Sequence, residues 1–172
     1  MNCEYKKKMA EELSFYDMSW KARVLRKESY FIGQYLKNLR KYEYYRSNGS
    51  FIGKIIGLCS YFRYRHYGYK LGFQIKPGTC DFNLKIYHYG TIIVNAGARL
   101  GKNCTIYPGV TIGQKEKGEV PVIGDNCFIG LGAMVFGAVY VGDNVVVAPN
   151  SVVVKNVESG RVVGGSPAKV IK

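Results

Sequence analysis

Histidine is the residue of this chain best suited to chemistry, and the sequence has two, His66 and His88. A neutral imidazole titrates near neutral pH, so it can take the proton from a hydroxyl group that attacks an activated carbonyl. His66 lies between Arg65 and Tyr67 in a basic segment, where a surface role is expected. His88 is the candidate general base, although an isolated histidine can also be a structural residue.

The cysteines do not point to a metal site or to a covalent mechanism. There are five, an odd number without the paired spacing of a zinc site: Cys3, Cys59, Cys80, Cys104 and Cys127. None is near His88 in the repeat described below, so we expect direct attack rather than an acyl-enzyme. Cys104 and Cys127 fall on small positions of that repeat, and we predict them to be reduced core residues. No metal is expected.

A six-residue repeat between Val94 and Val157 must position these groups. It places a branched aliphatic residue at every sixth position: Val94, Leu100, Ile106, Ile112, Ile123, Ile129, Val135, Val141, Val147 and Val153. Glycine follows five of these ten residues, where it is expected to relieve the backbone at a corner. A period of six fits neither an amphipathic helix nor an alternating strand. It predicts a parallel β-helix, in which three segments close a triangular coil and the aliphatic residues stack in a narrow lumen. A β-sandwich or a doubly wound α/β domain is the alternative, but neither requires ten unbroken matches.

One break interrupts this count. Ile112 and Ile123 are eleven residues apart, five more than one repeat step. The insert, residues 114–121, is polar, and we predict that it leaves the coil as a loop. Loops on a rigid scaffold often carry function. The sequence does not reveal which group orients the imidazole of His88; Glu116 and Glu119 of this loop, or a backbone carbonyl, are the candidates.

The position of His88 relative to the repeat is also unusual. Counting back six residues from Val94 reaches His88, where an aliphatic residue is expected. We therefore expect the backbone to bend at this position and to turn the imidazole outward.

Helices are expected ahead of the coils, in an extension over residues 1–72, with the β-helix over residues 73–172. Residues 1–28 indicate a frayed start and then a short helix. A helix over residues 29–46, with Ser29 as a possible N-cap, precedes a break at residues 47–50 and a second helix over residues 51–69. The apolar face of that second helix consists of Ile52, Ile55, Ile56, Cys59 and Phe62. The two helices are expected to pair and to cap the open first coil.

The formal net charge of +13 is concentrated at the N-terminal end. Residues 1–80 hold 16 Lys or Arg against 6 Asp or Glu, whereas residues 81–172 hold 9 against 6. Such a surface can contact anionic lipid or an acidic carbohydrate, or it can simply be solvated. No nucleic-acid recognition motif is found, so no nucleic-acid partner is expected. Capping is preferred to membrane contact, and the lack of a long apolar run or a secretory segment predicts a cytoplasmic protein.

The motifs around His88 and at the C-terminal end resemble a known family. Residues 86–95, the ending Gly-Gly-Ser-Pro-Ala-Lys-Val-Ile at residues 164–171 and the repeat itself are similar to hexapeptide-repeat acyltransferases. The branch resembled is that of serine acetyltransferases and related enzymes of capsule and O-antigen biosynthesis. The resemblance covers residues 29–172. It implies an all-β fold, a left-handed parallel β-helix with an N-terminal α-helical extension, acetyl-CoA as donor, and a homotrimer with active sites between protomers. His88 matches the catalytic histidine of the family.

Two departures from serine acetyltransferases concern the acceptor. An aspartate directly precedes the histidine in those enzymes, and here the position is Tyr87; a second histidine precedes the loop proline there, and here Val120 precedes Pro121. We therefore predict a sugar hydroxyl of a surface polysaccharide precursor as acceptor, contacted by Tyr87, Tyr89 and Glu119. L-Serine is the alternative acceptor. A catalytically silent scaffold is the alternative from another class. The three-histidine zinc site of some β-helix trimers cannot be built from two histidines.

The donor requires a track without side chains and hydrogen-bond donors for the developing oxyanion. The residues predicted to contact acetyl-CoA are Gly113, Gly130, Gly132, Ala148 and Lys169. Lys169 can pair with a CoA phosphate, and Gly113 is one candidate for the oxyanion donor. The glycines would serve turn geometry in any case.

Overall fold

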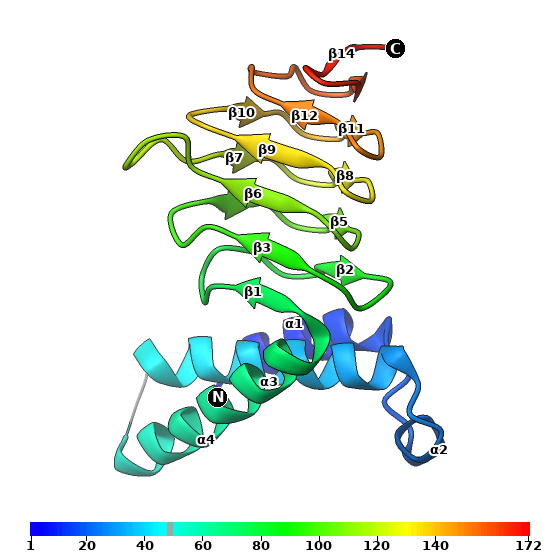
Figure 1. Cartoon of the computed structure of the whole chain (residues 1–172). Coiled ribbons are helices and arrows are strands. Elements are labelled where there is room, and N and C mark those ends of the chain that lie inside the picture. The colour runs from blue at the N-terminus through cyan, green and yellow to red at the C-terminus, as the bar shows by residue number, and fades with distance from the viewer. Residues whose placement is uncertain (48–49) are drawn as a thin grey trace.

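The computed structural model describes residues 1–47 and 50–172, in which a helical base carries a column of short strands (Figure 1). The base contains α1 (Cys3–Ser14), α2 (Trp20–Val24), α3 (Glu28–Ser47) and α4 (Phe51–Leu71). Side chains cap the starts of three of these helices: Asn2, Ser19 and Ser50 accept from backbone N–H groups of the first turns. Gly72 adopts a left-handed conformation at the end of α4, which a residue with a side chain rarely does.

The sequence located α3 and α4 to within about two residues but missed α1. The prediction of a frayed start is wrong because the Tyr5 hydroxyl donates to the backbone oxygen of Arg40 at 2.7 Å, which ties α1 to α3. Ser29 is not an N-cap, since α3 already begins at Glu28. Asn48 and Gly49, part of the predicted break, lie outside the described residues.

The strands form three sheets that run along the column. The five-stranded sheet consists of β1 (Phe73–Ile75), β3 (Ile92–Val94), β6 (Thr111–Gly113), β9 (Met134–Phe136) and β12 (Val152–Val153). The three-stranded sheet consists of β4 (Arg99–Leu100), β7 (Val122–Ile123) and β10 (Tyr140–Val141). The six-stranded sheet consists of β2 (Lys85–Ile86), β5 (Thr105–Ile106), β8 (Phe128–Ile129), β11 (Val146–Val147), β13 (Val162–Gly164) and β14 (Lys169–Val170). Only the β13–β14 pair is antiparallel among these described strands. The chain winds upward as a left-handed parallel β-helix (Figure 1), which confirms the predicted fold class.

The predicted aliphatic stack fills the lumen. All ten repeat residues are buried, and equivalent residues pair across neighbouring coils, as Ile106 does with Ile129 and Val94 with Ile112. Cys104 and Cys127 are buried free thiols that donate to the carbonyl oxygens of Gly124 and Gly142. This confirms their prediction as reduced core residues.

Close approach between coils explains the glycine that follows the aliphatic residue. A side chain at Gly124 would collide with the carboxylate of Asp143 on the next coil, although φ of Gly124 is not positive. Asparagines adopt the left-handed conformation instead, among them Asn103 (φ 58°) and Asn126 (φ 57°). The amide of Asn103 donates to Asn126 at 3.0 Å, so these corners are joined by side-chain hydrogen bonds. The left-handed corner conformation is therefore adopted by these asparagines and by other glycines, such as Gly109 and Gly132, and not by the glycines that directly follow the aliphatic residue.

Helix α3 closes the lower end of the lumen. Its Ile32, Tyr35, Leu36 and Leu39 are buried in one continuous core with the first coils. The Tyr35 hydroxyl donates to the backbone oxygen of Ile75 at 3.3 Å, so the helix is also hydrogen-bonded to β1. The predicted cap is thus present, and it is made by α3.

Helix α4 packs on α3 by an unexpected face. The residues that it buries are mostly small: Gly53, Gly57, Ser60, Tyr64, Gly68 and Leu71. A side-chain carbon at Gly57 would lie 3.2 Å from Cβ of Tyr45, so glycine allows α3 and α4 to approach closely. The expectation that the apolar face of Ile52, Ile55, Ile56, Cys59 and Phe62 packs against the protein is wrong, because all five are exposed. No helix in the described part of the chain is long and apolar enough to span a membrane.

Candidate active site

His88 lies at a corner of the coil that is two residues longer than its counterparts. Ile86 pairs with Ile106 and Val94 pairs with Ile112, so eight residues separate the lumen positions of the first coil where six separate those of the next. Ile86, not His88, therefore occupies the lumen position. The prediction that His88 replaces a lumen aliphatic is wrong in register, but the predicted bend and outward imidazole are confirmed. The His88 side chain is 62% exposed.

A carboxylate from the helical base orients the imidazole. Nδ1 of His88 lies 3.0 Å from Oε2 of Glu28, the first residue of α3. With Nδ1–H donated to this carboxylate, Nε2 carries the lone pair that can accept a proton. The sequence did not reveal Glu28, because sixty residues separate it from His88 and only folding brings them together.

Aromatic rings form the wall beside this dyad. Tyr87 stacks on Tyr107 with ring centroids 5.3 Å apart, and Phe15 packs edge-on against Tyr87 at 5.2 Å. The imidazole of His88 lies 6.3 Å from the Tyr107 ring. Tyr87, predicted to contact the acceptor, is thus held between Phe15 and Tyr107. Tyr89 is exposed on the same segment.

The predicted donor track lies on the same edge of the column as His88. We define the His88 edge as the corner where the chain passes from the six-stranded to the five-stranded sheet. Gly130, Gly132 and Ala148 follow β8 and β11 at this corner, in the coils above His88. Successive corners touch: a side chain at Gly90 would meet Pro108, and one at Gly109 would lie 3.0 Å from Cα of Gly132. Larger residues at these glycines would obstruct the edge.

Lys169 lies at the far end of this track. It pairs with Gly164 across β13 and β14, and Ala148 lies beside Gly164. The order of strands puts β14 five steps from β2, or about 24 Å at the usual strand spacing. That length is comparable with an extended acetyl-CoA molecule. The exposed ammonium of Lys169 is free to meet solvent there.

Gly113 and Glu119 lie on a different edge. Gly113 ends β6, where Phe136 occupies the space next to it. The loop of residues 114–121 projects beyond that point, which confirms its predicted departure from the coil (Figure 1). Figure 1 shows it at the opposite end of the five-stranded sheet from the β2–β3 corner of His88. Within one protomer Glu116 and Glu119 therefore do not orient the imidazole, and Gly113 is separated from it.

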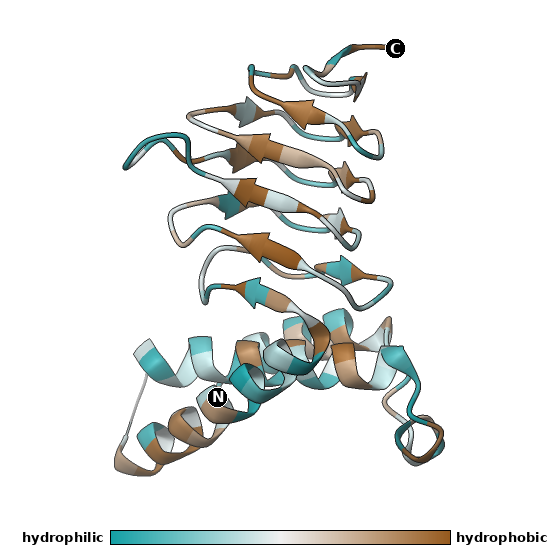
Figure 2. Ribbon diagram, viewed as in Figure 1, coloured by the Kyte–Doolittle hydropathy of each residue, from teal (hydrophilic) through white to brown (hydrophobic). Residues whose placement is uncertain are grey.

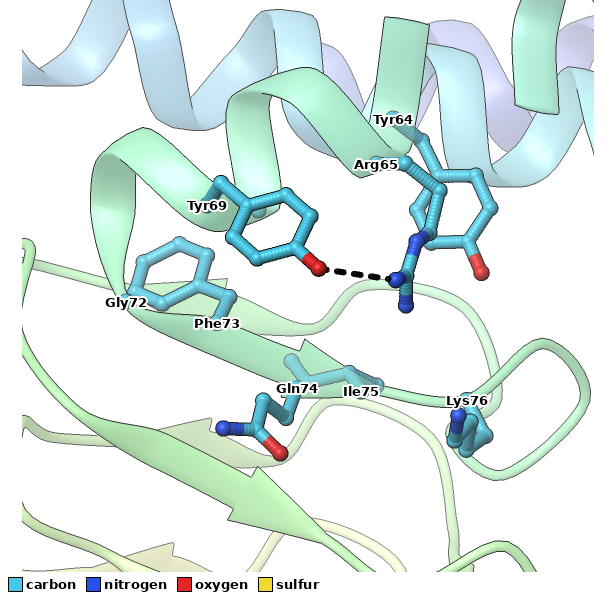
Figure 3. A pocket seen from close by; sticks show the side chains of 9 residues that line it. Tyr64, Arg65, Tyr69, Gly72, Phe73, Gln74, Ile75 and Lys76 are labelled. Atoms are coloured by element: carbon cyan, nitrogen blue, oxygen red, sulfur yellow. Dashed lines mark hydrogen bonds between the residues drawn. The ribbon is translucent and has the colours of Figure 1, made fainter. Parts of the chain in front are cut away.

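Among the described residues, two cavities lie at the base and a third, of about 300 Å³, lies beside Phe15 and Lys85; His88 lines none of the three. A cavity of about 280 Å³ separates the end of α4 from β1. Figure 3 shows the Arg65 guanidinium and the Tyr69 hydroxyl facing each other above β1, joined by a 3.3 Å hydrogen bond. A shallower cavity of about 710 Å³ follows the three-stranded sheet. We place the reaction in none of these cavities, because the candidate base, His88, lies outside all of them. No group of three metal-ligating side chains is found in the 170 residues outside Asn48 and Gly49.

Comparison with known proteins agrees with this fold. The family model described as the hexapeptide repeat of succinyl-transferase matches residues 91–115 and 122–155, on either side of the projecting loop. A serine acetyltransferase of Staphylococcus xylosus is 40% identical over 105 residues, which are 59% of this chain and 49% of that protein. Over these residues the chain is similar to hexapeptide-repeat acyltransferases.

The similarity is to serine acetyltransferases. The Staphylococcus epidermidis enzyme is 38% identical over 105 residues, 59% of this chain and 49% of that protein. The serine acetyltransferase of Neisseria gonorrhoeae, solved in complex with serine, superposes with a TM-score of 0.71 at 27% identity, over 99% of this chain and 70% of that chain. The Brucella abortus enzyme in complex with coenzyme A shares the fold, with a TM-score of 0.72 at 23% identity, over 99% of this chain and 68% of that chain. The chain spans about half the length of the curated relatives that it matches.

Proposed function

We propose that this protein transfers an acetyl group from acetyl-CoA to a hydroxyl acceptor. The observation that carries the proposal is the dyad of His88 and Glu28 at the lower end of the His88 edge. The same edge leads upward past Gly130, Gly132 and Ala148 to Lys169. A base, and a row of small residues on the same edge along which a thioester donor can lie, suit acetyl transfer to a hydroxyl acceptor.

The reaction follows from the roles of these atoms. The acceptor hydroxyl transfers its proton to Nε2 of His88 while its oxygen attacks the thioester carbon, and the carboxylate of Glu28 stabilises the imidazolium that forms. The tetrahedral intermediate collapses with cleavage of the carbon–sulfur bond. The imidazolium returns the proton to the leaving thiolate, so the products are the acetyl ester and CoA. Histidine acts only as a proton carrier, and no covalent enzyme intermediate forms.

L-Serine is the acceptor that we now place first. The relatives over this segment are named serine acetyltransferases, and the Neisseria gonorrhoeae structure holds serine. These findings favour the alternative over the sugar acceptor predicted from Tyr87 and Val120. A sugar hydroxyl remains the second candidate, because Tyr87 is committed to the aromatic wall and offers no carboxylate to an amino group.

We further propose a homotrimer with its active sites between protomers. Within one protomer the loop of residues 114–121 and His88 lie at opposite ends of the five-stranded sheet. A neighbouring protomer can bring its loop to this His88 edge, which would complete a site that is open and 62% exposed at the imidazole in one chain.

Measuring CoA release from acetyl-CoA tests the proposal. The full chain is assayed with L-serine, then with a panel of monosaccharides, nucleotide sugars and oligosaccharides. We expect turnover with L-serine to exceed turnover with every sugar. Turnover confined to a sugar would restore the second candidate, and a lack of acceptor-dependent CoA release throughout the panel would refute the acetyltransferase.

Glu28 is expected to act as a positioning residue for His88. The pair is exposed, and an exposed ion pair contributes up to about 1 kcal/mol, which is about a fivefold change in rate. We expect Glu28→Ala to lower kcat by about fivefold with little change in KM for acetyl-CoA. Glu28→Gln keeps an oxygen that can accept from Nδ1–H, so it should recover most of the loss.

The matched control is Glu4→Ala. Glu4 is also an acidic residue in the first turn of a helix, and it pairs with Lys8 at 2.7 Å, away from His88. Its removal should leave kcat unchanged. An equal fall in kcat for the Ala and Gln variants of Glu28, or a change in KM without a change in kcat, would show that Glu28 does not position the imidazole.

A further inference from the structure

The outer face of α4 carries a run of exposed apolar side chains. We define this face by Phe51, Ile52, Ile55, Ile56, Leu58, Cys59 and Phe62, all of which are exposed. At 100° per residue they lie opposite the small residues that α4 buries against α3. Large contiguous apolar surfaces on a protein mark interaction sites rather than ordinary exposure. Figure 2 shows the hydrophobic first half of α4 at the end of the base farthest from the C-terminus.

Positive charge continues the same face toward the end of α4. Arg63, His66 and Lys70 are exposed on the turns that follow Phe62. Lys54 is exposed among the apolar residues. From residue 44 to residue 80 the sequence contains six Lys or Arg and no Asp or Glu. The face is therefore apolar in its first half, basic in its second half, and without a compensating acidic residue on α4.

The charge decides between a lipid surface and a second copy of the chain. A second copy would bring the same positive charge to the contact, and α4 has no acid with which to pair it. An anionic bilayer offers both an apolar interior for the first half and negative headgroups for the second. The cap of the coil is already provided by α3, so the outer face of α4 is not needed to close the lumen.

We propose that the outer face of α4 docks the protein on an anionic lipid surface. The helix lies along the interface and does not cross it, in agreement with the absence of a spanning helix from the described residues. The proposal does not depend on the acetyl transfer proposed above, since none of its residues belongs to the His88 edge.

Cosedimentation with vesicles tests this docking directly. The full chain should bind vesicles of phosphatidylglycerol and phosphatidylcholine, bind phosphatidylcholine alone weakly, and dissociate as salt is raised. Ile52→Glu should weaken binding by at least tenfold, because it places a charge on the inserted face. Ile171→Glu is the matched control: Ile52 is 69% exposed and Ile171 67%, but Ile171 lies at the opposite end of the molecule. Arg63→Gln and Lys70→Gln should each weaken vesicle binding by about fivefold, because each cation near an anionic surface contributes about 1 kcal/mol to binding.

A fluorescent label at Cys59 reports the orientation. Cys3 and Cys59 are exposed, whereas Cys80, Cys104 and Cys127 are buried, so a Cys3→Ser variant can be labelled at Cys59 with an environment-sensitive dye. Anionic vesicles should shift its emission to the blue. The same dye on Cys3 in a Cys59→Ser variant should not shift, because Cys3 starts α1 and lies off the outer face of α4.

Two results would overturn the proposal. One is equal sedimentation of the wild-type chain with and without anionic lipid. The other is a fall in lipid-free molar mass on Ile52→Glu, measured by light scattering, which would show that a second copy covers the face.

Discussion

Replacing His88 with alanine is expected to lower kcat by about 10²–10⁴-fold, the usual contribution of a positioned general base. The imidazole lies at the lower end of the proposed donor track, and its Nδ1 is 3.0 Å from Oε2 of Glu28. The donor residues lie on higher coils, so the affinity for acetyl-CoA should change little.

The chain provides a control for this experiment in its other histidine. His66 is exposed on α4 and has no place on the His88 edge, so His66→Ala should keep full turnover. Melting temperatures of both variants should match the wild type, since each imidazole is exposed. Near-normal turnover of His88→Ala would remove it from the mechanism, and the loop of residues 114–121 would become the next candidate.

The sequence was most informative where one physical requirement repeats. Each coil must place a branched aliphatic residue in the lumen, so ten copies of that requirement predicted the buried stack and the projecting loop without ambiguity. The same regularity led to a wrong prediction of the register of His88. Counting in sixes assumes equal corners, and the two extra residues between Ile86 and Val94 are visible only when Ile86 pairs with Ile106.

Long-range pairing was out of reach of the repeat. Glu28 contacts His88 because α3 packs under the first coil, which places the first turn of α3 beside the corner that carries His88. The prediction of the buried face of α4 was wrong for another reason. Hydrophobicity indicated which face would be buried, but the close packing of α4 on α3 depends on Gly53 and Gly57. Small residues let the backbones of two helices approach closely, and a hydrophobic pattern does not indicate where such a contact forms. The residues of the proposed donor track were predicted from the small residues at the corners. That they lie on the same edge as His88 became clear only from the order of the strands along each coil.

The buried guanidinium of Arg40 is expected to be the side chain of the base most sensitive to replacement. The Arg40 side chain is 2% exposed and its partner Glu12 is fully buried. The guanidinium donates to both carboxylate oxygens of Glu12 at 2.8 Å. It also donates to the backbone oxygens of Cys80 at 2.8 Å and Asp81 at 2.7 Å, which ties α1 and α3 to the first coil.

Arg40→Ala should therefore lower the free energy of unfolding by about 3–5 kcal/mol, because it leaves the buried Glu12 carboxylate without an opposite charge and with only the Leu84 N–H as a hydrogen-bond donor. Urea titration at fixed protein concentration measures this change. Lys8→Ala is the control, since its pair with Glu4 is exposed to solvent and should contribute little to stability. Combining Arg40→Met with Glu12→Leu should restore much of the loss, because both buried charges are then removed. A cost below about 1 kcal/mol for Arg40→Ala would mean that water reaches Glu12 and that the base is held to the coil by its other contacts, such as the hydrogen bond from Tyr35 to Ile75.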